Sequence, residues 1–142
     1  MEAWLIFALI SAVTAALVAI FGKIGLQGID SNTATAIRAV IMALFLIGVV
    51  LMQNKLSQVN TILENRNAMI FIVLSGIMGA LSWLAYFLAL SSGKASQVAP
   101  IDRLSVVFVI ILAALFLGEK INIQTGIGTI LVAAGAIIIA MG

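Results

Sequence analysis

Three ionisable side chains stand inside long apolar stretches of the sequence: Arg38, Asp102 and Arg103. A charged group in such surroundings is costly, so it usually faces a wet cavity or pairs with another charge. There it could anchor a substrate, couple transport to a proton or act as a gate. Because Asp102 is the only acidic residue well inside an apolar stretch, any carboxylate-based proton coupling would depend on it.

Arg38 and Asp102 could meet at one depth. Each lies about five residues, roughly 8 Å, past the start of its apolar stretch, and both stretches begin on the same side of the membrane. Arg103 is about 100° around the helix from Asp102, so we expect it to reach back to the interface instead. The alternative is that Asp102 only favours the positive N-terminal end of its helix near Pro100, while both arginines reach the headgroups.

Aromatic side chains gather near the end of the third apolar stretch, where Trp83 and Phe87 are one helical turn apart and Tyr86 lies between them. They could form a cavity wall that stacks on flat or apolar substrates, or belong to the core or the interfacial belt. Pro100 could start the fourth helix or bend it as a gate. The candidate site therefore comprises Asp102, Arg38, Trp83 and Tyr86 as lining, with Pro100 as the gate.

The composition determines the solvent in which these residues lie. The chain has 142 residues, of which 64% are hydrophobic and 8% charged, with a mean hydropathy of +1.31. A water-soluble domain needs a polar surface, and this number of charged residues is too small to provide one. Most of the chain must therefore lie in lipid. Without cysteine or histidine, the chain cannot form disulfides, Cys/His zinc sites or imidazole acid–base pairs, and we expect neither a metal, a cofactor nor an enzyme. The net charge of +2 is scattered, which excludes a nucleic-acid surface.

Five stretches are long and apolar enough to cross a bilayer as helices. They are too long and too uniformly apolar for the strands of a membrane barrel. We therefore expect an all-α membrane protein made of one transmembrane domain over residues 1–142. The predicted helices span residues 3–22, 33–52, 68–90, 98–118 and 123–141.

The connections contain helix-start and helix-stop residues. Gly118 and the four residues after it predict a tight hairpin, which makes the fourth and fifth helices antiparallel neighbours. Residues 53–66 place apolar side chains at helical spacing, as expected either of a short helix on the membrane surface or of a solvated loop. The predicted N-caps are Ser31 or Asn32, Asn67, Ser96 and Asn122.

The cationic residues do not favour one orientation in the membrane. Lys55, Arg66 and Lys120 share the side of the N-terminus, whereas Lys23 and Lys94 lie on the other side. Arg38 and Arg103 lie near span ends on that second side, and counting them gives the second side the larger number of cationic residues. Because a clear excess of Lys and Arg is what fixes topology, copies could insert both ways and pair as an inverted repeat. A single orientation is the alternative.

An ordered series of residues runs along nearly the whole chain. It combines a proline early in the fourth helix, a Gly-Glu pair at its end and a glycine-spaced last helix. Its members are Lys23, Gly25, Leu26, Arg38, Tyr86, Phe87, Ala89, Leu90, Val98, Ala99, Pro100, Ile101, Leu104, Ser105, Leu117, Gly118, Glu119, Gly126, Gly128, Leu131 and Gly135. In this order they resemble the EamA family of the drug/metabolite transporter superfamily.

The resemblance implies one half of a ten-helix transporter. Typical members contain two five-helix units of inverted orientation and are similar to exporters of metabolites or drugs. This sequence contains a single unit and in this respect resembles the small five-helix members from bacteria and archaea. We therefore expect either a homodimer, whose two copies could lie in opposite orientations in the membrane, or a heterodimer with a paralogous unit. The interpretation is a carrier that exports a small-molecule solute across a prokaryotic cytoplasmic membrane, with a cavity lined by the first, third and fourth helices. The alternatives are an accessory membrane subunit and a flippase for lipids or lipid-linked sugars.

Overall fold

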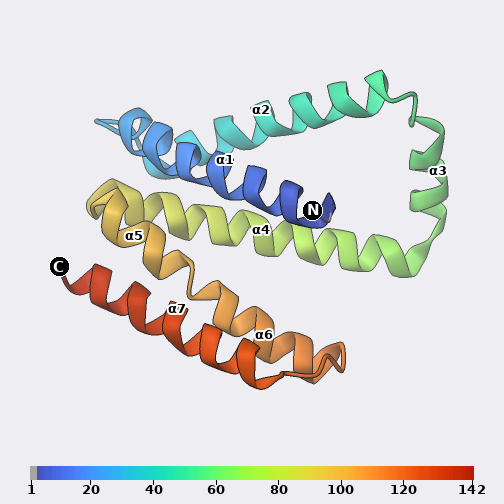
Figure 1. The fold of residues 1–142 in the computed structure, drawn as a ribbon. Helices are drawn as coiled ribbons and strands as arrows, with labels where there is room; N and C mark the ends of the chain where they lie inside the picture. Colours follow the sequence, from blue (N-terminus) through green and yellow to red (C-terminus); the bar gives the residue numbers. More distant parts are fainter. Residues whose placement is uncertain (1–2) are drawn as a thin grey trace. The chain divides into compact units, whose positions relative to one another are not determined.

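The computed structural model describes residues 3–142, which form helices joined by short connections (Figure 1). Five spans are long and apolar enough to cross a membrane, with the fourth divided between two helices, and this confirms the predicted helical membrane fold. No strand occurs among the described residues. The helices are α1 (Ala3–Gly25), α2 (Ser31–Met52), α3 (Ser57–Glu64), α4 (Arg66–Ser92), α5 (Ala95–Asp102), α6 (Ser105–Phe116) and α7 (Ile123–Met141).

Side-chain caps begin α2 and α7. The Oδ2 atom of Asp30 accepts hydrogen bonds from the amide of Thr33 at 2.7 Å and from its hydroxyl at 2.8 Å. These hydrogen bonds, of which the one from the amide has the larger effect, hold the pKa of Asp30 below its usual value. The cap of α2 is therefore Asp30, and the prediction of Ser31 or Asn32 is wrong by one or two residues. The predicted cap Asn122 is confirmed, since its Oδ1 accepts from the amide of Thr125 at 2.7 Å.

The starts of α4 and α5 differ from the predictions. Asn65, not Asn67, caps α4, because its Oδ1 accepts from the amide of Ala68 at 3.1 Å. Helix α5 follows Lys94, which makes no side-chain cap, so the predicted cap Ser96 lies inside the helix. Both helices begin two or three residues earlier than predicted, which brings more backbone groups into hydrogen bonds within the helix, as lipid requires.

The fourth span is broken, whereas one continuous helix over residues 98–118 was predicted. Pro100 has no N–H to donate four residues back. Beyond it, the amides of Arg103 and Leu104 donate to carbonyls three residues back, at 3.1 Å and 3.0 Å. Such tight bonds are typical of a 3₁₀ turn. The chain therefore changes direction between α5 and α6, and Arg103 lies at this break.

The connection between α2 and α4 contains α3, which confirms a helix within residues 53–66. Its apolar side chains, Val59 and Ile62 among them, are exposed. Its position on a membrane surface stays a prediction.

The hairpin between α6 and α7 has the predicted stop. Gly118 has a φ of +68°, a left-handed conformation that glycine adopts without strain. The amides of Leu117 and Glu119 both donate to the carbonyl of Ala113, at 3.0 Å and 3.2 Å. Helix α7 then contacts α6 and, more extensively, α5 (Figure 1). The antiparallel pair expected from the sequence is present.

The chain divides into two compact units, which we describe separately. Unit 1 comprises the described residues up to Ile24 together with Ser92–Gly142, and unit 2 comprises Gly25–Ser91. In unit 1 the amine of Lys23 donates to the carbonyl of Gly93 at 2.8 Å, which joins the end of α1 to the start of α5. The organisation as one transmembrane domain stays a prediction.

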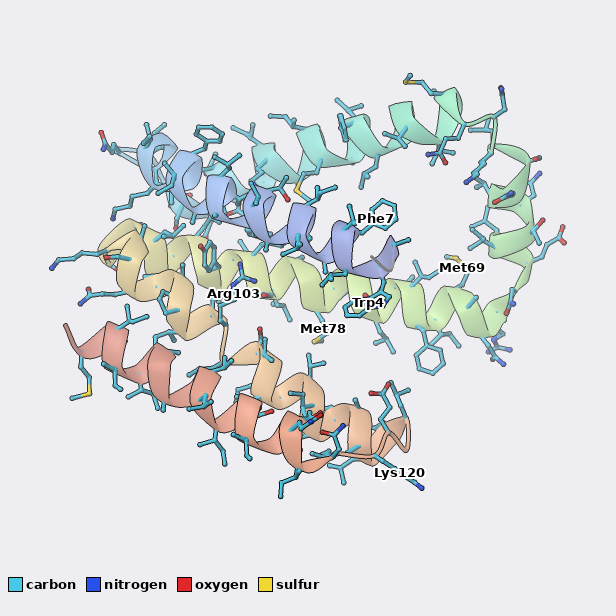
Figure 2. All side chains as sticks on the ribbon, in the orientation of Figure 1. Trp4, Phe7, Met69, Met78, Arg103 and Lys120 are labelled. Carbon is cyan, nitrogen blue, oxygen red and sulfur yellow. The ribbon has the colours of Figure 1, made fainter. Side chains whose placement is uncertain are left out.

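Most large apolar side chains of the described residues are exposed. Leu90 is fully buried and Phe87 is 4% exposed, but Phe7 and Phe116 are 70% and 81% exposed, and the side chains project outward all along the helices (Figure 2). An exposed apolar surface of this extent is compatible only with lipid or protein neighbours.

Candidate solute-binding pockets

Unit 2 has a pocket of about 680 Å³ between α2 and α4. Its walls are made mainly of small residues, such as Ala36 and Ala39 from α2 and Gly76 and Gly79 from α4. Residues without bulky side chains leave room between two helices that larger ones would fill. The volume lies within the range of roughly 300–1,000 Å³ that is typical of small-molecule sites.

Arg38 is the charged residue of this pocket. Its guanidinium carbon lies 3.6 Å from the centroid of the Trp83 ring and 5.0 Å from that of Phe87. The negative face of an indole ring attracts a cation and replaces part of its hydration. Both Arg38 and Trp83 line the pocket, so the structure brings these two predicted site residues together.

Trp83 also holds its neighbours on α4. Its ring centroid lies 5.6 Å from that of Tyr86 and 5.8 Å from that of Phe87, in edge-to-face arrangements. These contacts follow from spacings of three and four residues on one helix. Tyr86 therefore supports the ring of Trp83 rather than lining the pocket, and Phe87 is part of the buried core.

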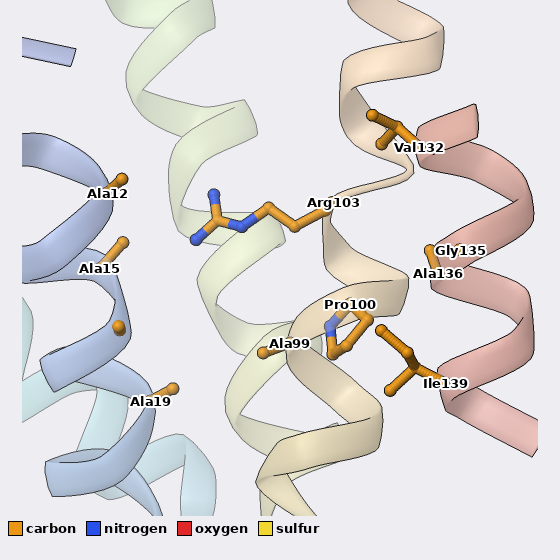
Figure 3. A pocket seen from close by; sticks show the side chains of 11 residues that line it. Ala12, Ala15, Ala19, Ala99, Pro100, Arg103, Val132, Gly135, Ala136 and Ile139 are labelled. Atoms are coloured by element: carbon orange, nitrogen blue, oxygen red, sulfur yellow. The ribbon is translucent and has the colours of Figure 1, made fainter. Parts of the chain in front are cut away.

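Unit 1 has a second pocket, of about 610 Å³, between α1, α5 and α7 (Figure 3). One wall is the small-residue face of α1, which includes Ala12, Ala15 and Ala19. Gly135 and Ala136 of α7 form the opposite wall.

Pro100 and Arg103 also line the unit 1 pocket. The side chain of Arg103 extends from the break after α5 towards α1 (Figure 3). From the sequence it was expected to reach back to the interface. Ala99 and Pro100 stand four and three residues before Arg103, so all three share one helix face. That spacing is the signal that could have identified Arg103 as a lining residue.

Asp102 lies apart from both described pockets. It is half-buried at the last position of α5 and is not among the residues that line either of them. The expected meeting of Arg38 and Asp102 involves both units and stays a prediction. Among the described residues there is no cluster of three or more His, Cys, Asp or Glu side chains that could hold a metal ion.

The five apolar spans and the two solute-sized pockets define a class: a helical, multi-pass membrane protein with room for small molecules between its helices. Residues 2–141 match the model of the EamA-like transporter family, and the chain belongs to this family. It is therefore a membrane transporter of a solute, as its resemblance implied.

A relative of known sequence supports the same assignment. An "Uncharacterized transporter in cobO 3'region" from Sinorhizobium sp is 41% identical to this chain over 140 residues. The alignment covers 99% of this chain and 98% of that protein, so the two are of nearly equal length. No solved structure gives a significant match.

Proposed function

We propose that the protein exports a small metabolite or drug-like solute across the cytoplasmic membrane by alternating access, as a dimer. The observation that carries this proposal is the unit 2 pocket, where Arg38 is held on the face of Trp83 between two membrane-spanning helices. A fixed cation in a pocket that is lined mainly by apolar residues gives a solute both a polar anchor and a hydrophobic environment.

Arg38 has hydrogen-bonding capacity to spare. A guanidinium has five N–H donors in its plane, and stacking on a ring uses its face rather than those donors. Within unit 2, all of whose residues are described, no group accepts a hydrogen bond from it. The edge of the guanidinium is therefore free to hold a solute, while Trp83 keeps it in position.

A dimer would provide the second five-helix unit of the transporter. Transporters with inverted repeats place the solute path between two five-helix units, and this chain has five spans. The nearly even distribution of Lys and Arg supports two oppositely inserted copies, and a paralogous unit is the other possible partner. In this scheme Asp102 couples a proton, and the break after Pro100 supplies the gate.

The test is efflux from liposomes that contain the purified chain alone. Vesicles loaded with radiolabelled amino acids, organic acids, nucleosides or lipophilic cations are assayed with and without a pH gradient. We expect efflux of at least one class, and at least a tenfold lower rate for Arg38→Gln. The matched control is Arg66→Gln, which removes an exposed arginine at the start of α4.

Two outcomes would contradict the proposal. Efflux that appears only after a second membrane protein is added would identify an accessory subunit. Movement of labelled lipids between leaflets without solute efflux would identify a flippase.

A further inference from the structure

Arg103 is the one charged residue among those that line the pocket of unit 1. It stands eight residues into the fourth span, roughly 12 Å along a helix at about 1.5 Å per residue, in a hydrocarbon layer about 30 Å thick. A guanidinium at that depth is costly unless water or a negative group compensates its charge.

No described residue of unit 1 supplies that compensation. Among the described residues of the unit, no carboxylate pairs with Arg103, and no carbonyl or hydroxyl accepts a hydrogen bond from its side chain. Its neighbour Asp102 lies on another face of the helix and is not part of the lining. Among the described residues, no aromatic ring makes with Arg103 the kind of contact that holds Arg38.

The surroundings of Arg103 would strengthen its attraction for an anion. The facing wall is alanine from α1, and the remaining lining residues are alanine, glycine, proline, valine and isoleucine. Arg103 itself is exposed, so its donors are accessible to a solute, and a hydrogen bond between its charge and an anion is stronger than one between neutral groups. The pocket volume of about 610 Å³ accommodates an organic anion of several heavy atoms.

We propose that the unit 1 pocket is an anion site, in which Arg103 binds the carboxylate or phosphate of a molecule whose body is largely apolar. The planar guanidinium matches two oxygens of such a group with two parallel hydrogen bonds. The small residues Ala12, Ala15 and Gly135 leave room for the apolar body. The inference rests on the proposed transport function, because it assigns the solute to the class of organic anions.

The unit 2 pocket independently favours a negatively charged solute. Its single charged lining residue is also an arginine, and none of its described lining residues is acidic. Two pockets in one chain, each with one arginine and no carboxylate, favour negatively charged solutes over cations.

The test is the binding of radiolabelled benzoate to the purified chain in a neutral detergent, by equilibrium dialysis. Benzamide, which has nearly the same shape without the charge, is the paired ligand. We expect benzoate to bind at least tenfold more tightly than benzamide. Arg103→Gln is expected to raise the Kd for benzoate at least tenfold, and Arg103→Lys to raise it less, because lysine keeps the charge but loses the two-pronged geometry.

Two further variants separate the site from general effects. Lys120→Gln removes a cation whose side chain projects from the hairpin (Figure 2), and it should leave the Kd unchanged. Ala15→Leu fills the pocket but keeps Arg103, and it should weaken benzoate binding severalfold. If Arg103→Gln fails to fold, Ala15→Leu and Arg103→Lys still carry the test.

A lipid headgroup is the second possible source of the anion. Thermal stability is measured in the same detergent with added phosphatidylglycerol or phosphatidylcholine. A stabilisation by phosphatidylglycerol that Arg103→Gln abolishes, without benzoate binding, would support the anion site and assign it to lipid. Benzamide binding equal to that of benzoate, or no effect of any Arg103 or Ala15 variant with either ligand, would overturn the proposal.

The result is separable from the proposed transport function. Arg103-dependent binding without efflux of any solute would retain the anion site and refute the carrier. Efflux of uncharged or cationic solutes without Arg103-dependent binding would retain the carrier and refute the anion site.

Discussion

At the scale of single residues, the contact between Arg38 and Trp83 explains how a guanidinium persists between two apolar helices. The ring face, 3.6 Å from the guanidinium carbon, replaces part of the water that the cation has lost. Arginine suits this role better than lysine because its flat, weakly hydrated group stacks on a ring. The stack leaves the donors of Arg38 available and is therefore compatible with both a structural and a binding role.

The first prediction is an energetic coupling between these two residues. In a double-mutant cycle with Arg38→Gln and Trp83→Leu, we expect a coupling of about 1 kcal/mol in the free energy of unfolding, because each single change already removes the cation–π contact. The measurement is unfolding in mixed detergent micelles. Additive effects of the two substitutions would show that the contact contributes no stability.

The second prediction concerns Asp102. If it couples a proton, Asp102→Asn should abolish efflux driven by a pH gradient and leave expression and solute binding intact. Efflux is measured in liposomes with and without the gradient, and Glu119→Gln, in the exposed hairpin, is the control. Unchanged gradient-driven efflux in Asp102→Asn would remove this residue from the mechanism.

At the scale of the elements, the break in the fourth span has the largest consequence. It separates α5 from α6 at a 3₁₀ turn beside Arg103, which lines a pocket, and both helices contact α7. Two contacts hold α5 at its start: the turn before it accepts from Lys23, and Gln97 donates from Nε2 to the carbonyl of Ala140 at 3.3 Å. Motion at the break would therefore move α6 relative to a fixed α5.

The third prediction is that Pro100→Ala makes the helix more regular across the break between α5 and α6. Alanine supplies an N–H that can donate to the carbonyl of Ser96 and removes the ring that clashes with that carbonyl, so the amides of residues 97–104 should exchange with deuterium at least tenfold more slowly, corresponding to about 1.4 kcal/mol of added local stability. If the break is the gate, efflux should slow as well. The control is Ile111→Ala, in the regular part of α6. Unchanged exchange would mean that the proline does not cause the break.

The fourth prediction follows from the cap of α2. Because the pKa of Asp30 is depressed in the folded protein, its carboxylate stabilises the fold above the pKa of the unfolded chain, and this stabilisation is lost as the pH falls through the folded pKa. Asp30→Ala should therefore lower the Tm at pH 6, and the difference from the unchanged protein should shrink as the pH drops below about 4. A difference in Tm that is independent of pH would contradict this role of the carboxylate.

At the scale of the whole molecule, the question is how many copies work together and which way they face. The described residues expose large apolar side chains along all five spans. Lipid can cover this surface, and so can a second copy. The even distribution of cations favours neither orientation.

The fifth prediction is dual insertion. Reporter proteins fused to the C-terminus, one active only in the cytoplasm and the other only outside it, should both give signal. Adding two lysines beside Lys120 should shift the ratio of the two signals, because it biases Lys and Arg towards one side. A signal from only one reporter, unchanged by the added lysines, would exclude inverted pairing of identical chains.

The sequence by itself determined the features that depend on local chemistry. Apolar length identifies five spans, and the stop at Gly118 and the cap at Asn122 follow from the backbone needs of helix ends. The caps Asp30 and Asn65 were misplaced by one or two residues, because neighbouring polar residues offer equivalent oxygens and only the geometry selects between them.

The tertiary structure alone decided which side chains share a pocket. Arg38 and Trp83 come together because α2 and α4 line one pocket, and Arg103 lines the other pocket together with Ala99 and Pro100 of the same helix face. Neither helix rotation nor the position of a break can be read from a stretch that is apolar on every face, since such a stretch has no polar side to fix its orientation. Packing between helices supplies that missing information.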